Sequence, residues 1–171
     1  MHLWNRLRPV AAHSFTPSQT LGVLAGALRA GLVAEGVDCM IQQQDVVVPR
    51  GMEAFYDRFH FAPAIKDGDR LFCSGQLGNN AANRLAEDPE AQFVQAFDNV
   101  KAVLEAAGAS FADVVEMTTF HVGLQTHLRT FMGVKDRYLQ APYPAWTAIG
   151  VSELAFPGAL VEIKVTARLP R

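Results

Sequence analysis

Residues 159–169 read Ala-Leu-Val-Glu-Ile-Lys-Val-Thr-Ala-Arg-Leu, and in this stretch apolar side chains alternate with side chains that are mostly polar. A period of two is typical of a β-strand, because successive side chains of a strand point to opposite faces of its sheet. The stretch therefore predicts a strand with one apolar face and one largely polar face. Helices that cover the apolar face would leave the second face of the sheet to be buried or solvated.

A helix is expected upstream of this strand, over residues 88–108. Asp88 is a natural N-cap, Pro89 suits the first helical position, and Glu90 lies favourably in the first turn. Apolar residues spaced by four, three and four define one face of this helix: Phe93, Phe97, Val100 and Leu104. Gly108 is placed to end the helix.

The remaining segments predict four more strands and a second helix. Strands are expected over residues 58–65, 70–74, 114–122 and 146–151, the first two joined as a hairpin by a polar turn containing Gly68. Phe59 and Phe61 are interpreted as core residues. Thr126 is placed to cap the second helix, which ends before the Pro-Tyr-Pro at 142–144. One side of that helix holds Leu128, Phe131, Met132, Lys135 and Tyr138. The expected order is β-β-α-β-α-β-β, and because the sequence contains no internal repeat, a single domain is expected.

The first 39 residues differ from the rest in composition. Three arginines are the only charged side chains before Glu35, and an acid-poor start of this kind is similar to an organellar transit peptide. Alternatively, Met40 is the true start, and residues 1–39 are upstream sequence or a poorly ordered tail. The second interpretation is favoured. We therefore expect residues 1–39 to be a non-domain extension and residues 40–171 to form the domain.

Composition narrows the class of protein. The 171 residues are 50% hydrophobic and 19% charged, with a formal net charge of −2, as in ordinary globular proteins. Because no basic stripe is present, a nucleic-acid partner is not expected. No apolar run reaches the roughly 20 residues needed to cross a bilayer, so a membrane partner is not expected either. The two cysteines lack paired spacing and fit a reducing, cytoplasmic location.

Several motifs of known chemistry are absent from the sequence. There is no HExxH, no paired Cys/His spacing and no acidic calcium loop, so a dedicated metal site is not expected. No glycine-rich phosphate loop suggests a cofactor. Ser74 lies in Cys73-Ser74-Gly75-Gln76, but a nucleophile elbow needs a glycine two positions before its serine, and Phe72 occupies that position. A serine hydrolase is therefore not expected.

Three segments, read together, resemble the RidA/YjgF family. They are Leu71–Gln76 (LFCSGQ), Ala96–Gly108 (AFDNVKAVLEAAG) and Val161–Ala167 (VEIKVTA), and the resemblance covers roughly residues 55–171. It implies a chorismate-mutase-like α+β fold, a mixed β-sheet with two helices on one face. It also implies a homotrimer whose three sheets form a central barrel, with a small-molecule site in each cleft between neighbouring subunits.

The resemblance also implies a reaction. RidA-type members hydrolyse reactive 2-imino or enamino acids to 2-keto acids and ammonia. In them an arginine binds the substrate carboxylate, a Ser-Gly segment contributes a main-chain donor, and a glutamate on the last strand helps to position the water. By position, Glu162 matches the glutamate, and Ser74 and Gly75 match the Ser-Gly segment.

The arginine does not carry over to this sequence. It would follow Pro144-Ala145, where Trp146 and then Thr147 stand, and an indole supplies neither a positive charge nor a fork of donors. The cysteine and tyrosine often found in the family match Ala148 and Ala64. The stretch around Trp146 instead resembles the YjgH-like branch, which lacks the carboxylate-binding arginine.

Three hypotheses for function follow. The first is an enzyme that deaminates a reactive imine, enamine or related small carbonyl metabolite lacking an essential carboxylate. Glu162 would handle the water, Ser74 and Gly75 would hold developing charge, and Trp146 would shape the pocket. The second is a non-catalytic, metabolite-binding trimer. The third is an ordinary 2-iminobutanoate/2-iminopropanoate deaminase with a substitute arginine, for which Arg129 is the candidate. Endoribonuclease activity, attributed to some relatives, gains little support from the charge distribution.

The candidate residues also have purely structural interpretations. Trp146 could pack at the subunit interface without meeting a ligand. Glu162 could form an ion pair with Lys164, Arg168 or Arg129. His121 is interpreted as structural.

Overall fold

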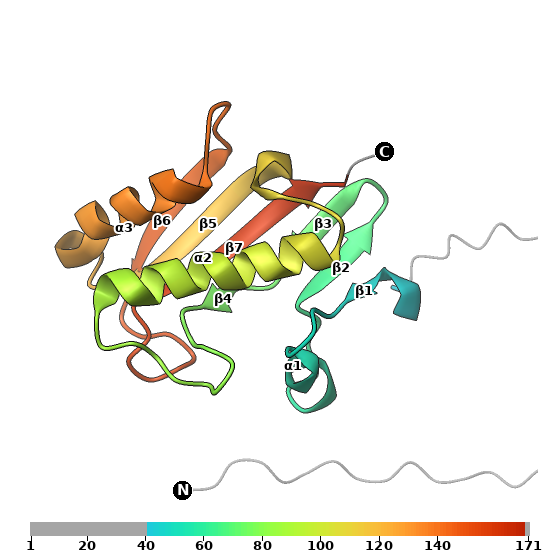
Figure 1. The fold of residues 1–171 in the computed structure, drawn as a ribbon, viewed down its shortest axis with the longest axis horizontal. Coiled ribbons are helices and arrows are strands. Elements are labelled where there is room, and N and C mark those ends of the chain that lie inside the picture. The colour runs from blue at the N-terminus through green and yellow to red at the C-terminus, as the bar shows by residue number, and fades with distance from the viewer. Residues whose placement is uncertain (1–40, 170–171) are drawn as a thin grey trace, which may run out of the picture. The chain divides into compact units, whose positions relative to one another are not determined.

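The computed structural model describes residues 41–169, which form a mixed seven-stranded sheet with two long helices on one face (Figure 1). The strands are β1 (Val46–Val47), β2 (Ala64–Asp67), β3 (Arg70–Cys73), β4 (Gln76–Leu77), β5 (Val114–Val122), β6 (Ala145–Val151) and β7 (Val161–Arg168). The α-helices are α1 (Glu53–Asp57), α2 (Pro89–Ala106) and α3 (Leu124–Tyr138). Two short 3-10 helices span Gln43–Asp45 and Phe111–Asp113.

The strands are arranged in the order β1-β2-β3-β7-β5-β6, and β4 pairs with β7 beyond the end of β3. All pairs are antiparallel except β5 and β6, which run parallel and are joined by α3. A parallel pair requires a crossover, and here α3 provides it. Strand β6 is last in the order and so lies at an edge of the sheet, and none of its residues is buried.

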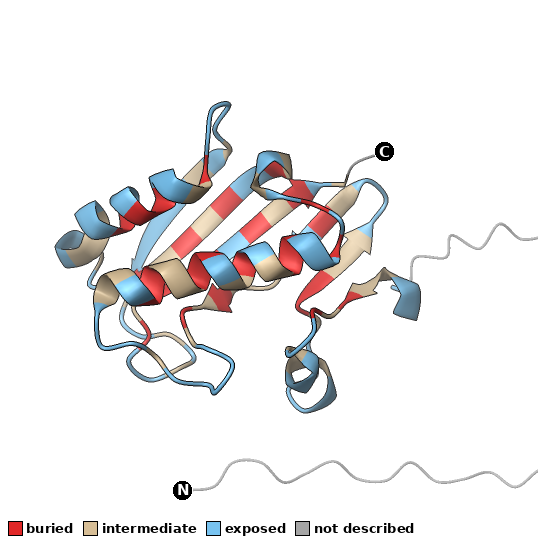
Figure 2. Cartoon of the chain, viewed as in Figure 1, coloured by how far each residue is buried: buried red, intermediate tan, exposed pale blue. Residues whose placement is uncertain are grey.

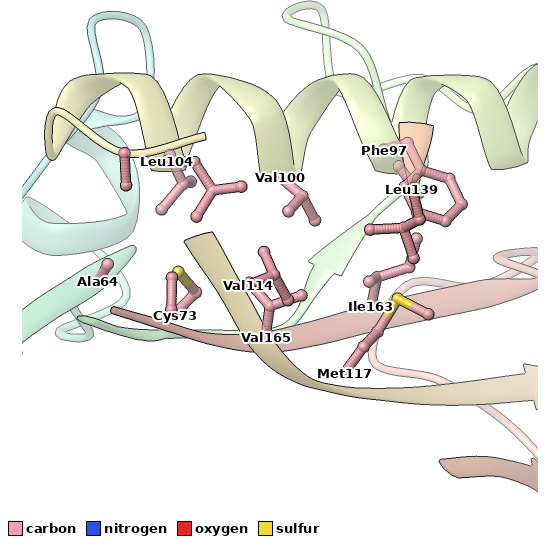
Figure 3. Close-up of a cluster of buried hydrophobic side chains, with 14 of the residues drawn as sticks. Ala64, Cys73, Phe97, Val100, Leu104, Val114, Met117, Leu139, Ile163 and Val165 are labelled. Carbon is pink, nitrogen blue, oxygen red and sulfur yellow. The ribbon is translucent and has the colours of Figure 1, made fainter. Parts of the chain in front are cut away.

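The predicted alternation of the last strand is confirmed. Val161, Ile163, Val165 and Ala167 are at most 2% exposed and face α2, whereas Glu162 and Lys164 lie on the opposite face (Figure 2). The core fills the space between α2 and this side of the sheet, as the close-up of Val100, Leu104, Val114, Ile163 and Val165 shows (Figure 3). We call the sheet face under the helices the helix face and the other the open face.

The predicted features of α2 are also present. The Asp88 carboxylate caps the helix by accepting a hydrogen bond of 2.9 Å from the N–H of Ala91, with Pro89 in the first turn. The predicted apolar face is fully buried: Phe93, Phe97, Val100 and Leu104. Gly108 follows the helix with a φ of +82°, a conformation that favours glycine.

Two predictions about the start of the domain are wrong. Residues 58–63 are not a strand, since β2 begins only at Ala64 and the short helix α1 precedes them. Phe59 and Phe61 are 65% and 41% exposed rather than buried. They follow α1, and the aromatic ring that they contact within the described residues is that of Phe55. The hairpin itself is confirmed as β2–β3, with Gly68 in its turn at a φ of +58°.

The second helix begins earlier than predicted. It starts at Leu124, after Gly123 with a φ of +68°, so Thr126 does not cap it. Within it Phe131, Val134 and Lys135 are buried, but Met132 is exposed. The proposed extension at residues 1–39 lies outside the described residues. In the described part of the chain, no helix is both long and apolar enough to span a bilayer.

Candidate functional site

Glu162 projects from β7 onto the open face of the sheet. Its register partner on β5 is Phe120, and on the other side it pairs with Leu77 of β4. Phe120 in turn pairs with Ile149 of β6. The carboxylate is therefore half-buried among apolar neighbours on the central strand.

Gly75 lies directly against this carboxyl group. It occupies the irregular connection between β3 and β4, where the pairing with β7 is interrupted. A Cβ built on Gly75 would lie 2.6 Å from Cδ and 2.7 Å from Cγ of Glu162, and closer still to Oε1. Only glycine leaves room for the Glu162 side chain in this position.

The environment of Glu162 favours its protonated form. Burial raises the pKa of this carboxyl above its ordinary value, because a carboxylate loses hydration there. Among residues 41–169 the side chain makes no ion pair, so the structural interpretation as a partner of Lys164, Arg168 or Arg129 is not observed. A carboxyl with these surroundings is suited to exchange a proton with a bound molecule.

Ser74 and Gly75 differ in the donors that they offer. The Ser74 hydroxyl donates to the carbonyl of Ala62 at 2.7 Å, and its backbone N–H donates to the carbonyl of Pro63 at 2.9 Å. The N–H of Gly75 donates no hydrogen bond to any described residue. The main-chain donor of this segment that lacks a partner among the described residues is thus the N–H of Gly75, whereas the Ser74 hydrogen bonds hold the segment to Ala62 and Pro63.

Trp146 lies on the other side of the sheet. In register with Met117, it faces the helices and packs against Phe131 of α3, with ring centroids 5.9 Å apart. Its Nε1–H donates a hydrogen bond of 3.0 Å to Oγ1 of Thr119. Within one chain, therefore, Trp146 and Glu162 do not share a cleft, and the indole N–H already has a partner.

A buried cation lies beside Trp146. Lys135 of α3 is 7% exposed, and its Nζ lies 5.5 Å from the ring centroid of Trp146 and 5.9 Å from that of Tyr143. Sequence reasoning placed Lys135 on the buried side of the helix but assigned it no role. The missed signal was a lysine at the helical spacing of Phe131 and Tyr138, since ammonium groups are rarely fully buried.

Arg129 and Thr147 remain apart from these residues. Arg129 is exposed on α3, and it precedes the buried Phe131 by two positions, a rotation of about 200° around a helix. It therefore lies on the far side of α3 from the Phe131 ring. Thr147 is exposed and lies on the open face, in register with Thr118.

His121 belongs to the polar chain behind Trp146. It is fully buried, and its Nε2 lies 2.8 Å from Oγ1 of Thr119, the same atom that accepts from Trp146. Its ring meets Phe131 edge to face at 4.6 Å. Burial lowers the pKa of His121 to about 4, so the ring is neutral near pH 7. This placement agrees with the structural interpretation.

The described residues offer no evident metal site. Between residues 41 and 169, no three histidine, cysteine, aspartate or glutamate side chains gather as a metal would require. The candidate site consists of Glu162 and Gly75 on the open face, and of Trp146 with Lys135 on the helix face.

The sequence and the fold of this chain are similar to those of known proteins. The sequence profile of the family described as Endoribonuclease L-PSP matches residues 52–169. The RutC family protein YjgH of Escherichia coli is 40% identical over 129 residues, which cover 75% of this chain and 97% of that protein. The solved structure of a protein YjgH, at 40% identity, superposes with a TM-score of 0.68 over 74% of this chain and 96% of the other.

A further relative has a named activity. The 2-iminobutanoate/2-iminopropanoate deaminase of Dermatophagoides farinae is 37% identical over 111 residues, covering 61% of this chain and 81% of the relative.

Proposed function

Because the chain belongs to the RidA/YjgF (L-PSP) family, we propose that it deaminates a reactive imine, enamine or related small carbonyl metabolite by hydrolysis. The main support is Glu162, a half-buried carboxyl without an ion pair among the described residues. Its side chain lies against Gly75, whose N–H donates no hydrogen bond to a described residue. The relative named as a deaminase agrees with this class of reaction.

The chemistry needs one group that exchanges protons. Water adds to the carbon of the C=N bond, and Glu162 takes a proton from that water as the C–O bond forms. Glu162 passes that proton to the nitrogen, which gives a carbinolamine. The carboxylate then takes the hydroxyl proton and delivers it to the nitrogen as the C=O bond forms and the C–N bond breaks, so that ammonia and a carbonyl product leave. A raised pKa suits Glu162 to both halves of this cycle, because the carboxyl accepts and holds a proton more readily than an ordinary glutamate does. The N–H of Gly75 stabilises the oxygen on which negative charge develops.

The complete site is proposed to lie between copies of the chain. Glu162 and Trp146 occupy opposite faces of one sheet, so a single ligand can meet both only if they come from neighbouring chains. The open face also exposes large apolar side chains, Phe72 at 46% and Ile149 at 40%. Burial of this face in a homotrimer, with the three sheets forming a central barrel, would remove these side chains from water.

The reaction is proposed to proceed without the arginine of the RidA branch. Trp146 occupies that position and is a neutral side chain whose N–H is bound to Thr119. Arg129, the substitute considered from the sequence, is exposed on the far side of α3.

Ammonia release tests the proposal. The full chain is given a panel of imines and enamines generated in situ, and release is corrected for spontaneous hydrolysis. Glu162→Gln is expected to lose the enzymatic part of the rate. Glu116→Gln, which changes an exposed carboxylate on β5, is the matched control and is expected to keep it. If no compound on the panel is hydrolysed faster than the background, the proposed activity is rejected and the non-catalytic, metabolite-binding trimer becomes the favoured hypothesis.

A further inference from the structure

Lys135 is the one formally charged side chain that is buried among residues 41–169. A buried ammonium is unfavourable unless it is well paired, because the charge loses its hydration. Here the pairing is incomplete. The Nζ makes an ion pair of 2.5 Å with Oδ1 of Asp136, the next residue along the helix, whose side chain is 62% exposed.

The ammonium has donors left over. It carries three N–H groups, and one hydrogen bond, to Asp136, is present within the described residues. The faces of Trp146 and Tyr143 lie within 5.5 and 5.9 Å and stabilise the charge without accepting a conventional hydrogen bond. Two N–H groups therefore have no acceptor among residues 41–169 and remain for a bound acceptor.

The surroundings indicate what kind of acceptor fits. Trp146 and the 69% exposed Tyr143 form aromatic walls around the ammonium, and Phe131 lies behind Trp146. Such walls suit a small organic acid, whose apolar carbons can contact the rings while its carboxylate reaches Nζ. Inorganic phosphate has no apolar part to occupy them. The exposed carboxylate of Asp136 occupies the position that a ligand carboxylate would take.

We infer that Lys135, framed by Trp146 and Tyr143, is the carboxylate-binding residue of this chain, and that its ligand is a small organic acid that displaces Asp136. The inference deepens the proposed function and rests on it for the reaction, since it makes the imine or enamine substrate an anionic one. An anionic substrate differs from the expectation, based on the missing arginine, that the substrate lacks an essential carboxylate.

Binding of stable acids tests the inference without any turnover. The sequence has two tryptophans, so a Trp4→Phe background leaves Trp146 as the single indole reporter. Butanoate is expected to change its emission saturably, whereas the neutral butanamide and inorganic phosphate are not. Lys135→Met keeps the apolar stem and is expected to weaken butanoate binding by about tenfold to a hundredfold, the loss of one charge-assisted hydrogen bond.

Three further variants make the test specific. Lys135→Arg is expected to retain binding, and Arg129→Met, the matched loss of a positive charge on the same helix, is expected to leave it unchanged. Asp136→Asn is expected to tighten binding several-fold, because the competing carboxylate is gone. Unchanged binding in a folded Lys135→Met protein, equal binding of butanamide, or no saturable butanoate response would each overturn the inference. Butanoate binding without ammonia release would leave it standing and reject the proposed reaction instead.

Discussion

The carboxyl group of Glu162 occupies the space that a side chain at position 75 would need. The Cβ of an alanine there would lie 2.6 Å from Cδ of Glu162, far inside van der Waals contact. The proposed proton-exchanging group and the proposed main-chain donor are therefore mutually dependent, because the glutamate keeps its position only beside a glycine.

Replacement of this glycine should affect both stability and reaction. Gly75→Ala is expected to lower the free energy of unfolding by about 1–3 kcal/mol, the usual range for overpacking, and to reduce ammonia release by displacing Glu162. Gly133→Ala is the control, since a Cβ at that position of α3 would meet nothing within 4 Å. That change is expected to be neutral or to stabilise the helix by about 0.5–1 kcal/mol. Urea denaturation and the ammonia assay measure the two effects. Full activity in Gly75→Ala would contradict the proposed role of the contact.

The raised pKa of Glu162 predicts a pH-dependent contribution to stability. In the folded protein the pKa of Glu162 lies above 4.5, its ordinary value. At pH values between 4.5 and the folded pKa, the native protein therefore binds more protons than the unfolded chain. The contribution of Glu162 to the free energy of unfolding is therefore fully present below pH 4.5. It is lost as the pH rises through the pKa of the folded state. Glu162→Gln cannot ionise and escapes this loss. Relative to the natural protein, its free energy of unfolding should rise as pH increases from about 4 to 7. Denaturation curves at several pH values test this, with Glu116→Gln as reference. A constant difference between the two proteins would show that Glu162 ionises normally.

The polar chain behind Trp146 can be tested at Thr119. Thr119→Val removes the acceptor of the Trp146 N–H and the partner of His121, and is expected to cost about 1–3 kcal/mol because buried polar groups lose their partners. Thr118→Val, on the open face, is the matched control and should cost less. A double-mutant cycle with Trp146→Phe should give a coupling of about 0.5 kcal/mol or more. Additive effects would mean that the hydrogen bond contributes nothing measurable.

Assembly through the open face is open to direct measurement. Sedimentation should give a mass near three times that of the 18.7 kDa chain. Phe72→Asp places a charge among the exposed apolar side chains of this face and is expected to shift the protein towards monomers while far-UV circular dichroism stays unchanged. Phe59→Asp alters an even more exposed phenylalanine outside the sheet and should leave the mass unchanged. A monomer in the natural protein would reject an interface site altogether.

The elements predicted correctly from the sequence are those whose own pattern is long and regular. The alternation of β7 and the capped, periodic α2 are local signals, and both are confirmed. The two-residue strands β1 and β4 have no such pattern, because their pairing with β2 and β7 creates them. Residues 58–63 are rich in aromatic side chains, as strands are, yet they follow the short helix α1 and the strand begins only at Ala64.

The candidate site was predictable only in part. Resemblance pointed to Ser74, Gly75 and Glu162, and the structure places Gly75 and Glu162 in contact. That Trp146 faces away from Glu162 depends on the register between β5 and β6, where Trp146 pairs with Met117. Parallel register is set by tertiary packing around the crossover helix rather than by local sequence. The position of Lys135 beside two aromatic rings depends on the same packing.

Trp146 and Lys135 lie on one face of the sheet and Glu162 lies on the other. Two inactive variants, Lys135→Met and Glu162→Gln, should therefore complement each other and restore activity when they are combined in one trimer. If each site draws Glu162 from one chain and Lys135 from its neighbour, trimers of Lys135→Met alone or of Glu162→Gln alone contain no intact site. Mixed trimers, formed by unfolding and refolding the two together, join an intact Glu162 to an intact Lys135 at some interfaces. Random mixing in equal amounts gives about one intact site in four, so roughly a quarter of the natural activity should return.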